Sequence, residues 1–234
     1  IYTLSLHDAL PILAYIYTEL GESDYFNSYD PIHDGYGPEL KNGIHIIGSS
    51  DSLIIFNYSG NNTDVKQYFS PFNAGVNGFI LENVNIECSN CRYCVHDERY
   101  TSGDQYINKY LNCNMKLDNS NNIYGYRQCI GGGLGIQGET IIENCYFEST
   151  GDTVAEVVSY HNSESSSAKS NVVIIGNYCN NGTIRLSYHG TSTKKTTAIV
   201  SNNSIPSAVI LRAESTGDVT VNVELYEWNN YIRS

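Results

Sequence analysis

The chain has 234 residues, of which 13 are Lys or Arg and 25 are Asp or Glu, so its formal net charge at pH 7 is −12. A single domain with a substantial hydrophobic core is the expectation for this length. The composition argues against a nucleic-acid partner, since the basic residues are scattered, and against a membrane partner, since no apolar run approaches the ~20 residues of a spanning helix.

The rest of the composition is polar, weakly charged and aromatic. Charged residues make up 16% of the chain, while Tyr alone reaches 20 residues. Sugars offer hydroxyl groups and flat C–H faces, so such a chain suits carbohydrate recognition. The alternative is that tyrosine only fills β-strands, for which it has a high propensity.

The first twelve residues read Ile-Tyr-Thr-Leu-Ser-Leu-His-Asp-Ala-Leu-Pro-Ile, which resembles a translated sequencing-adapter oligonucleotide. A genuine amphipathic or signal segment is the alternative. A signal peptide needs a basic n-region, however, and no Lys or Arg precedes Lys41. We therefore expect 1–12 to be non-native, 13–42 to be an irregular segment or the remnant of a truncated coil, and 43–234 to be one domain.

From Gly43 onward, short apolar runs recur, and each is followed by Asn or Gly. The runs are residues 43–48, 78–86, 110–117, 140–147, 172–179 and 198–205, with a looser one at 219–228. The residues that close them are Asn83, Asn112, Asn144, Asn177 and Asn203, spaced by 29, 32, 33 and 26 residues. Periods of this length indicate a solenoid or a propeller.

Two or three short strands per period, bent at Asn and Gly, favour a solenoid over a propeller blade, which needs four antiparallel strands. We therefore expect an all-β, single-stranded right-handed parallel β-helix of about six to seven coils. Asn83, Asn112, Asn144 and Asn177 should stack in one column at a bend. A jelly roll or sandwich is the alternative fold, because such folds also show short strands at regular spacing.

A second strand follows each bend, at residues 92–98, 125–130, 156–161, 183–189 and 208–213. Side chains alternate between the two faces of a strand. If Val95, Val158 and Leu186 point inward, the following point outward: Arg92, His96, His161, Arg185 and His189. The four-residue interval from Arg to His occurs twice, which predicts a row of three histidines, with Arg127 or Gln128 in the intermediate coil. Such a row on a rigid sheet favours a ligand site, while a solvated polar face is the alternative.

The candidate catalytic residues are His96, Asp97, Glu98 and Asp152. Carboxylates in adjacent coils would lie ~5 Å apart, as in retaining glycosidases, and carboxylates two coils apart ~9–10 Å, near the inverting range. Asp152 lies two coils from Asp97 and Glu98. A lyase would instead need a base, either His96 or an Arg, and a cation or an Arg to neutralise the substrate carboxylate. For Asp97 and Glu98 the alternative is a solvated turn.

The seven cysteines are Cys88, Cys91, Cys94, Cys113, Cys129, Cys145 and Cys179. An odd count argues against a complete disulfide framework. The Cys-x-x-Cys-x-x-Cys spacing at 88–94 lacks the second pair or the histidines of a structural zinc site. Buried free thiols are therefore the preferred interpretation. Cys113 and Cys145 each follow a repeat Asn directly, as a stacked pair in neighbouring coils would.

The coils resemble the pectin-lyase-like right-handed β-helix family. The residues that carry the resemblance are the Asn-Cys-Tyr-Phe and Ile-Ile-Gly-Asn bends, Arg-Tyr-Cys-Val-His-Asp-Glu at 92–98 and Gly-Gly-Gly-Leu-Gly at 131–135. Within that family the chain resembles tail-spike and tail-fibre-associated proteins of phages from gut bacteria.

The resemblance implies a carbohydrate-interacting protein, either a polysaccharide lyase or hydrolase or a non-catalytic adhesin or tail-fibre module. It also implies a polysaccharide or host surface glycan as partner, a homotrimer, and a place on a virion tail or outside the cell. The Asp cluster beside an Arg that binds calcium in pectate lyases has no clear match here, nor have the paired Asp motifs of polygalacturonases. No cofactor is therefore expected; calcium is possible, but no motif in the sequence supports it.

Overall fold

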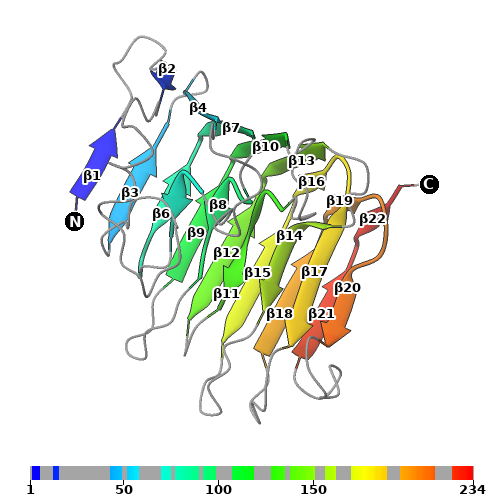
Figure 1. Ribbon diagram of the computed structural model, residues 1–234. Coiled ribbons are helices and arrows are strands. Elements are labelled where there is room, and N and C mark those ends of the chain that lie inside the picture. The colour runs from blue at the N-terminus through cyan, green and yellow to red at the C-terminus, as the bar shows by residue number, and fades with distance from the viewer. Residues whose placement is uncertain are drawn as a thin grey trace.

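The structure is a computed structural model in which every described element is a β-strand (Figure 1). Within the described ranges, accordingly, no helix has the length and apolar character to cross a membrane. The described residues are 2–5, 13–15, 43–48, 52–57, 70–74, 77–89, 92–98, 107–118, 128–134, 138–150, 156–161, 170–188, 196–213 and 223–233.

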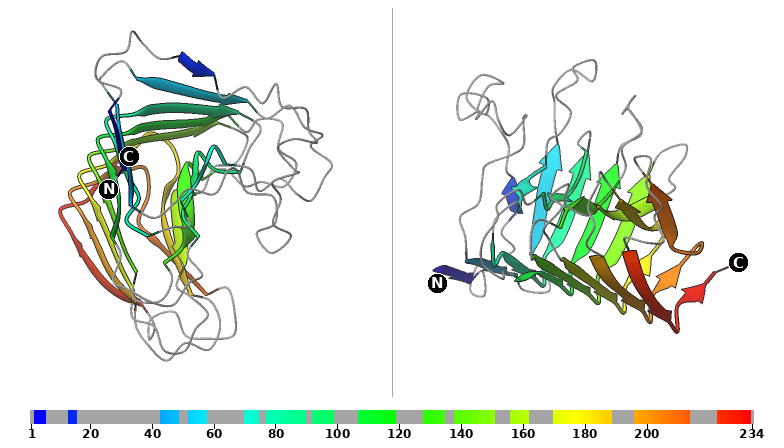
Figure 2. Two further views of the ribbon diagram at one scale, coloured as in Figure 1. Left: turned by 90° about the vertical axis from the view of Figure 1, so that its left-hand side faces the viewer. Right: turned by 90° about the horizontal axis from the view of Figure 1, so that it is seen from below.

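The strands are shared among three sheets, which form three walls of one solenoid when the molecule is viewed end-on (Figure 2). Sheet A contains β1 (Tyr2–Ser5), β3 (Ile44–Ile47), β6 (Ile80–Glu82), β9 (Ile107–Leu111), β12 (Glu139–Glu143), β15 (Asn171–Ile175), β18 (Thr196–Ser201) and β21 (Val223–Trp228). Sheet B contains β2 (Leu13–Tyr15), β4 (Leu53–Asn57), β7 (Asn85–Ser89), β10 (Asn114–Asp118), β13 (Tyr146–Thr150), β16 (Tyr178–Cys179), β19 (Ser204–Ile205) and β22 (Tyr231–Ile232). Sheet C contains β5 (Phe72–Asn73), β8 (Val95–His96), β11 (Ile130–Gly133), β14 (Glu156–His161), β17 (Thr183–Tyr188) and β20 (Ile210–Ala213).

Every pairing between these strands is parallel and joins one coil to the next. This confirms the expected all-β parallel β-helix and excludes an antiparallel sandwich for the described strands. The coil count differs slightly from the expected six to seven, because sheets A and B each stack eight strands and sheet C stacks six. Strands β1 and β2 extend the sheets to the N-terminal side of residue 43.

The interior is filled by columns of apolar side chains, one residue per coil, because alternate residues of each strand point inward. Each column member is at most 3% exposed. The columns are Leu81, Tyr110, Ile142, Ile174 and Val200 in sheet A, Ile86, Met115, Phe147 and Cys179 in sheet B, and Val95, Ile130, Val158 and Ile184 in sheet C. Fully burying a large apolar side chain contributes about 1.5–3 kcal/mol, so these columns supply the main stabilisation.

In six consecutive coils, the bend from sheet A to sheet B is made by one left-handed residue. These residues are Asn83, Asn112, Asn144, Gly176, Asn202 and Asn229, with φ between 53° and 71°. Asn tolerates this conformation better than other residues with a Cβ. Asn83, Asn112 and Asn144 thus share one column, as the sequence predicts. The prediction is wrong for Asn177, because Gly176 takes the equivalent place in its coil, as Asn202 does beside Asn203 in the next coil.

Asn177 and Asn203 belong to the next column, which forms a hydrogen-bonded ladder inside the solenoid. Each member accepts the backbone N–H of the member in the preceding coil. Cys113 N–H donates to Cys145 Sγ (3.4 Å), and Cys145 N–H to Asn177 Oδ1 (2.8 Å). Asn177 N–H donates to Asn203 Oδ1 (2.9 Å), and Asn203 N–H to Asn230 Oδ1 (3.0 Å). The expected stacking of Cys113 on Cys145 is therefore confirmed, and it is part of the same ladder as the amides.

Candidate functional site

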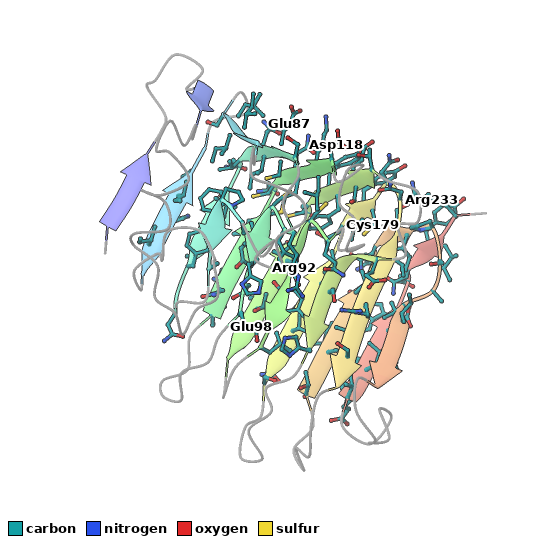
Figure 3. The ribbon with its side chains drawn as sticks, viewed as in Figure 1. Glu87, Arg92, Glu98, Asp118, Cys179 and Arg233 are labelled. Carbon is teal, nitrogen blue, oxygen red and sulfur yellow. The ribbon has the colours of Figure 1, made fainter. Side chains whose placement is uncertain are left out.

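The strongest candidate site lies on the outer face of sheet C, where the backbone register brings charged side chains from different coils together. One outer column contains His96, Gly131, Ser159 and Arg185. The next outer column contains Gly133, His161 and Ser187, and the Glu98 carboxylate lies beside Gly133. Arg92 and Glu98 are labelled on this part of the molecule in Figure 3.

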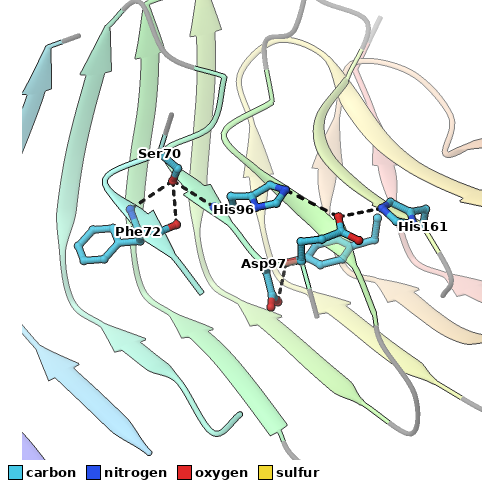
Figure 4. A network of polar contacts seen from close by, with 7 residues as sticks. Ser70, Phe72, His96, Asp97 and His161 are labelled. Atoms are coloured by element: carbon cyan, nitrogen blue, oxygen red, sulfur yellow. Dashed lines mark hydrogen bonds and ion pairs between the residues drawn. The ribbon is translucent and has the colours of Figure 1, made fainter. Parts of the chain in front are cut away.

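Glu98 lies between two histidines, His96 and His161, which are labelled in Figure 4. Its Oε2 atom is 2.9 Å from Nε2 of His161 and 3.7 Å from Nε2 of His96. The side chain of Glu98 is 12% exposed and that of His161 is 26% exposed. A substrate group could therefore reach the pair from solvent, while most of its surface is shielded from water. Shielding strengthens the electrostatic interaction between a carboxylate and an imidazole.

Gly133 is the residue that allows Glu98 and His161 to meet. The two belong to coils on either side of β11, so their side chains approach each other across this strand. A Cβ atom at Gly133 would lie 2.1 Å from Glu98 Oε1 and 2.9 Å from His161 Cε1. A side chain at this position would displace the Glu98 carboxylate or the His161 ring, so the glycine in the intermediate coil preserves their contact.

His96 points to the same outer face but is only 2% exposed. The ring of Tyr93 packs against it with centroids 4.9 Å apart, and the Arg92 guanidinium lies 4.9 Å from the Tyr93 ring centroid. The backbone N–H of His96 donates to Ser70 Oγ at 3.1 Å. Burial, followed by the positive charges of Arg92 and His161, holds the pKa of His96 well below its ordinary value. His96 is therefore neutral near pH 7.

A second polar group lies beside this cluster. Arg185 NH1 is 3.0 Å from Glu156 Oε1, and its Nε donates to Ser159 Oγ at 2.9 Å. Gln128 Nε2 donates to the same oxygen of Glu156 at 3.3 Å, and Gln128 is itself buried. Arg185 and Gln128 thus bind a protein carboxylate, so their predicted contact with a substrate would require that ion pair to open.

Asp97, one of the four catalytic candidates predicted from the sequence, faces the interior and is fully buried. Its carboxylate accepts hydrogen bonds from Asn108 Nδ2 (3.0 Å), Thr140 Oγ1 (3.1 Å) and Tyr160 OH (3.2 Å). Successive side chains of an extended strand point to opposite faces, so Asp97 cannot share the outer face with His96. The Asp97 carboxylate thus joins residues of sheets A and C by hydrogen bonds inside the solenoid and does not contact solvent.

The predicted single row of histidines is also wrong in register. His96 and His161 share the outer face, but they belong to different columns, two residues apart along the strand. Arg185 occupies the column of His96, so the two Arg-to-His intervals of the sequence do not superpose. Three of the predicted site residues, Arg127, Asp152 and His189, lie outside the described residues.

No group of three or more His, Cys, Asp or Glu side chains that could hold a metal ion occurs among the described residues. The described cysteines are Cys88, Cys94, Cys113, Cys129, Cys145 and Cys179, and all are buried free thiols. Cys91, the middle residue of the Cys-x-x-Cys-x-x-Cys motif, lies outside the described residues. The preferred interpretation of these six thiols as small buried groups is confirmed.

Sequence reasoning missed three residues that shape the site: Tyr93, Gly133 and Glu156. The run of glycines at 131–133 is apparent in the sequence. A glycine indicates that other groups approach the backbone closely, but the sequence does not identify those groups. Glu156 was visible as a carboxylate at the start of a predicted strand. Its pairing with Arg185 depends on the register between β14 and β17, which shifts between Glu156 and Val158.

Comparison with known proteins gives no relative: no family model, no curated protein and no solved structure matches the chain. The parallel solenoid is consistent with a pectin-lyase-like β-helix on topology alone.

Proposed function

We propose that this chain is a carbohydrate-interacting β-helix protein that degrades a polysaccharide, with Glu98 and His161 as its acid–base pair. The observation that carries the proposal is the Glu98 carboxylate held 2.9 Å from His161 over the gap at Gly133. A carboxylate and an imidazole in contact, partly shielded and still reachable, can take up and return a proton during bond cleavage.

The described residues fit β-elimination better than hydrolysis. Hydrolysis of a glycosidic bond generally uses two carboxylates. Among the described residues on the outer face of sheet C, the carboxylates are Glu98 and Glu156, and Glu156 is bound by Arg185 and Gln128. β-Elimination from a uronate-containing polymer needs one base and a proton for the leaving group. The base removes the proton next to the carboxyl group, a double bond forms as the glycosidic C–O bond breaks, and the departing oxygen takes a proton from the acid–base pair or from water.

Glycan binding without cleavage is the second candidate, and exposed tyrosines on sheet B favour it. Tyr146 and Tyr178 stack in neighbouring coils with ring centroids 5.6 Å apart. Tyr178 is 40% exposed, and Tyr231, two coils further along the column, is 66% exposed. Exposed aromatic rings in line with the solenoid axis could contact the C–H faces of a sugar chain.

The supposed setting is a phage tail or a secreted microbial protein. The resemblance of the repeat to tail-spike β-helices supports it, and so does the stacking of parallel coils along one axis (Figure 1). A polysaccharide of the host surface would be the partner in that setting. Genes for tail proteins beside this gene would support the phage origin, and a neighbourhood of sugar-uptake genes would favour a secreted bacterial protein.

The test is product analysis with pectin, polygalacturonate and bacterial capsular polysaccharide. Ultraviolet absorbance of unsaturated uronate reports elimination, and new reducing ends without that absorbance report hydrolysis. We expect Glu98→Gln and His161→Ala each to lower the rate at least about a hundredfold, the usual scale of acid–base catalysis. Glu87→Gln is the matched control, because Glu87 is an ion-paired carboxylate on sheet B, away from the site (Figure 3).

Two outcomes would contradict the proposal. Full activity in both site variants would remove Glu98 and His161 from the chemistry. Binding of a polysaccharide without any product would favour the glycan-binding candidate, in which case variants of Tyr178 and Tyr231 should weaken binding.

A further inference from the structure

The two chain segments that carry the Glu98–His161 pair are joined by a second pair of side chains inside the solenoid. Asp97 directly precedes Glu98, and Tyr160 directly precedes His161. Asp97 points into the solenoid, away from His161 (Figure 4), and its Oδ2 accepts a hydrogen bond from Tyr160 OH at 3.2 Å. The same two segments are therefore linked twice, by Glu98 and His161 on the outer face and by Asp97 and Tyr160 on the inner face.

Both links cross the intermediate strand β11 at a glycine. In the register of β11 with β14, Gly132 is paired with Tyr160 and Gly133 with His161. A Cβ atom at Gly132 would lie 2.2 Å from the carbonyl oxygen of Asp97, and its φ of 154° also favours glycine. The linked residues are two strand spacings apart, about 10 Å between backbones. Glycine at both positions therefore lets side chains of alternate coils meet on both faces of the sheet.

The inner link belongs to a hydrogen-bonded network that is shielded from water. Asp97 and Tyr160 are both fully buried, at 0% and 1% exposed. The Asp97 carboxylate also accepts hydrogen bonds from Asn108 Nδ2 at 3.0 Å and from Thr140 Oγ1 at 3.1 Å, and both residues belong to sheet A. Asn108 in turn donates to the carbonyl of Ala74 at 3.1 Å. Hydrogen bonds are stronger in a low dielectric than in water, so this network anchors the inner link to the opposite wall of the solenoid.

Packing alone does not call for a carboxylate in this part of the core. The same inner column continues in the next coil with the buried Leu186, and the adjacent inner column contains Val95, Ile130 and Val158. Burying a carboxylate is costly unless it is hydrogen-bonded, and an apolar residue of similar volume often fills such a place with equal or greater stability. The carboxylate of Asp97 is therefore better explained by the residues that it holds in place than by the space that it fills.

We infer that Asp97 and Tyr160 are positioning residues, whose hydrogen bond inside the solenoid fixes the separation of Glu98 and His161 outside it. His161 is the last residue of β14, and rotation about the side-chain bonds of either outer residue would part the pair. Their contact must also open when a substrate group enters, and the inner link keeps the two backbones in place while it does. For its effect on catalysis this inference rests on the proposed function, but the geometry that it explains does not depend on that function.

Tyr160→Phe is the test variant, because it removes one hydroxyl group and keeps the ring that fills the core. A misplacement of about 1 Å can lower a catalytic rate about a hundredfold. Because the backbone ladder between β11 and β14 is retained, we expect kcat on the cleaved polysaccharide to fall about tenfold and KM to stay within about twofold. Tyr110→Phe is the matched control, since it makes the same change at another fully buried tyrosine, on sheet A. Its kcat should stay within about twofold of the wild type.

A second measurement needs no substrate. An ionised Glu98 can only accept hydrogen bonds, so the proton in its 2.9 Å contact belongs to Nε2 of His161. In NMR spectra of the full chain with isotope-labelled histidine, a hydrogen-bonded Nε2–H exchanges slowly with water and gives a resonance that is lost when the bond breaks. We expect this resonance in the wild type and in Tyr110→Phe. It should be lost in Tyr160→Phe, as in the reference variant Glu98→Ala, while circular dichroism shows that each variant is folded.

An unchanged His161 resonance in Tyr160→Phe would overturn the inference, because the outer pair would then form without the inner link. Absence of the resonance from the wild type, or its loss in Tyr110→Phe as well, would overturn it too. Failure of the proposed function gives a different result: the wild type cleaves no polysaccharide, while the resonance still depends on the hydroxyl of Tyr160. The inner link would then position Glu98 and His161 as inferred, in a pair that is not catalytic.

Discussion

The inner ladder makes a sharp prediction about stability at Asn177, which is 2% exposed. Its Oδ1 accepts the Cys145 N–H at 2.8 Å, and its Nδ2 donates to the Ile142 carbonyl at 3.1 Å and to Asn203 Oδ1 at 2.9 Å. Replacing Asn177 by Ala leaves at least one buried N–H and one buried carbonyl without this partner. Each unsatisfied group costs about 1–3 kcal/mol, so the free energy of unfolding should fall by about 2–6 kcal/mol.

The same column offers its own conservative replacement. Cys145 accepts the N–H of Cys113 through Sγ at 3.4 Å and lies near the Tyr110 carbonyl at 3.4 Å, so a thiol can fill a place in the ladder. Asn177→Cys should therefore be at least about 1 kcal/mol more stable than Asn177→Ala. Asn144→Gly is the control at the exposed bend, where glycine accepts the φ of 54° and the change should stay within about 1 kcal/mol.

The assay is urea unfolding followed by circular dichroism, with the three variants compared at equal denaturant slope. The reasoning is refuted if Asn177→Ala lies within about 0.5 kcal/mol of the wild type, the range of an ordinary surface substitution. It is also refuted if Asn177→Cys is as unstable as Asn177→Ala, because the thiol would then not replace the amide.

Three further predictions concern pH, thiols and the N-terminal segment. The pKa of buried His96 is lowered in the folded state, so the unfolded state binds the proton more readily. The free energy of unfolding should therefore fall as pH drops below about 6.5, by up to ~1.4 kcal/mol per pH unit. Urea unfolding of His96→Gln should show a smaller dependence of stability on pH. Burial raises the pKa of the Cys94, Cys129 and Cys145 thiols. Iodoacetamide should therefore label them far more slowly in the native state than in denaturant, as followed by mass spectrometry. Fast labelling of the native protein would contradict their burial. Deleting residues 1–12 should leave the melting temperature unchanged or higher; a large loss would show that the pairing of β1 with β3 stabilises the fold.

Local pattern in the sequence was enough to predict the architecture. A period near 30 residues, short strands and recurrent Asn bends together indicate a parallel solenoid, because each feature depends only on residues close in sequence. The same holds for Asn83, Asn112 and Asn144, since a left-handed bend selects Asn locally. The inward direction of Val95 and Val158 followed from alternation, which is a property of any extended strand.

Which residues share a column was decided by the tertiary structure, because the register between strands of neighbouring coils depends on connecting loops of variable length. Moving one residue along a strand turns a side chain to the other face, which is why Asp97 faces the core while His96 and Glu98 face outward. Glu98 and His161 are 63 positions apart and meet only because Gly133, in the coil between them, has no side chain. Asn177 likewise lies in the inner ladder because Gly176 makes the bend in its coil. The sequence thus determined which residues belong to strands and bends, and the stacking of one coil on the next determined which of them touch.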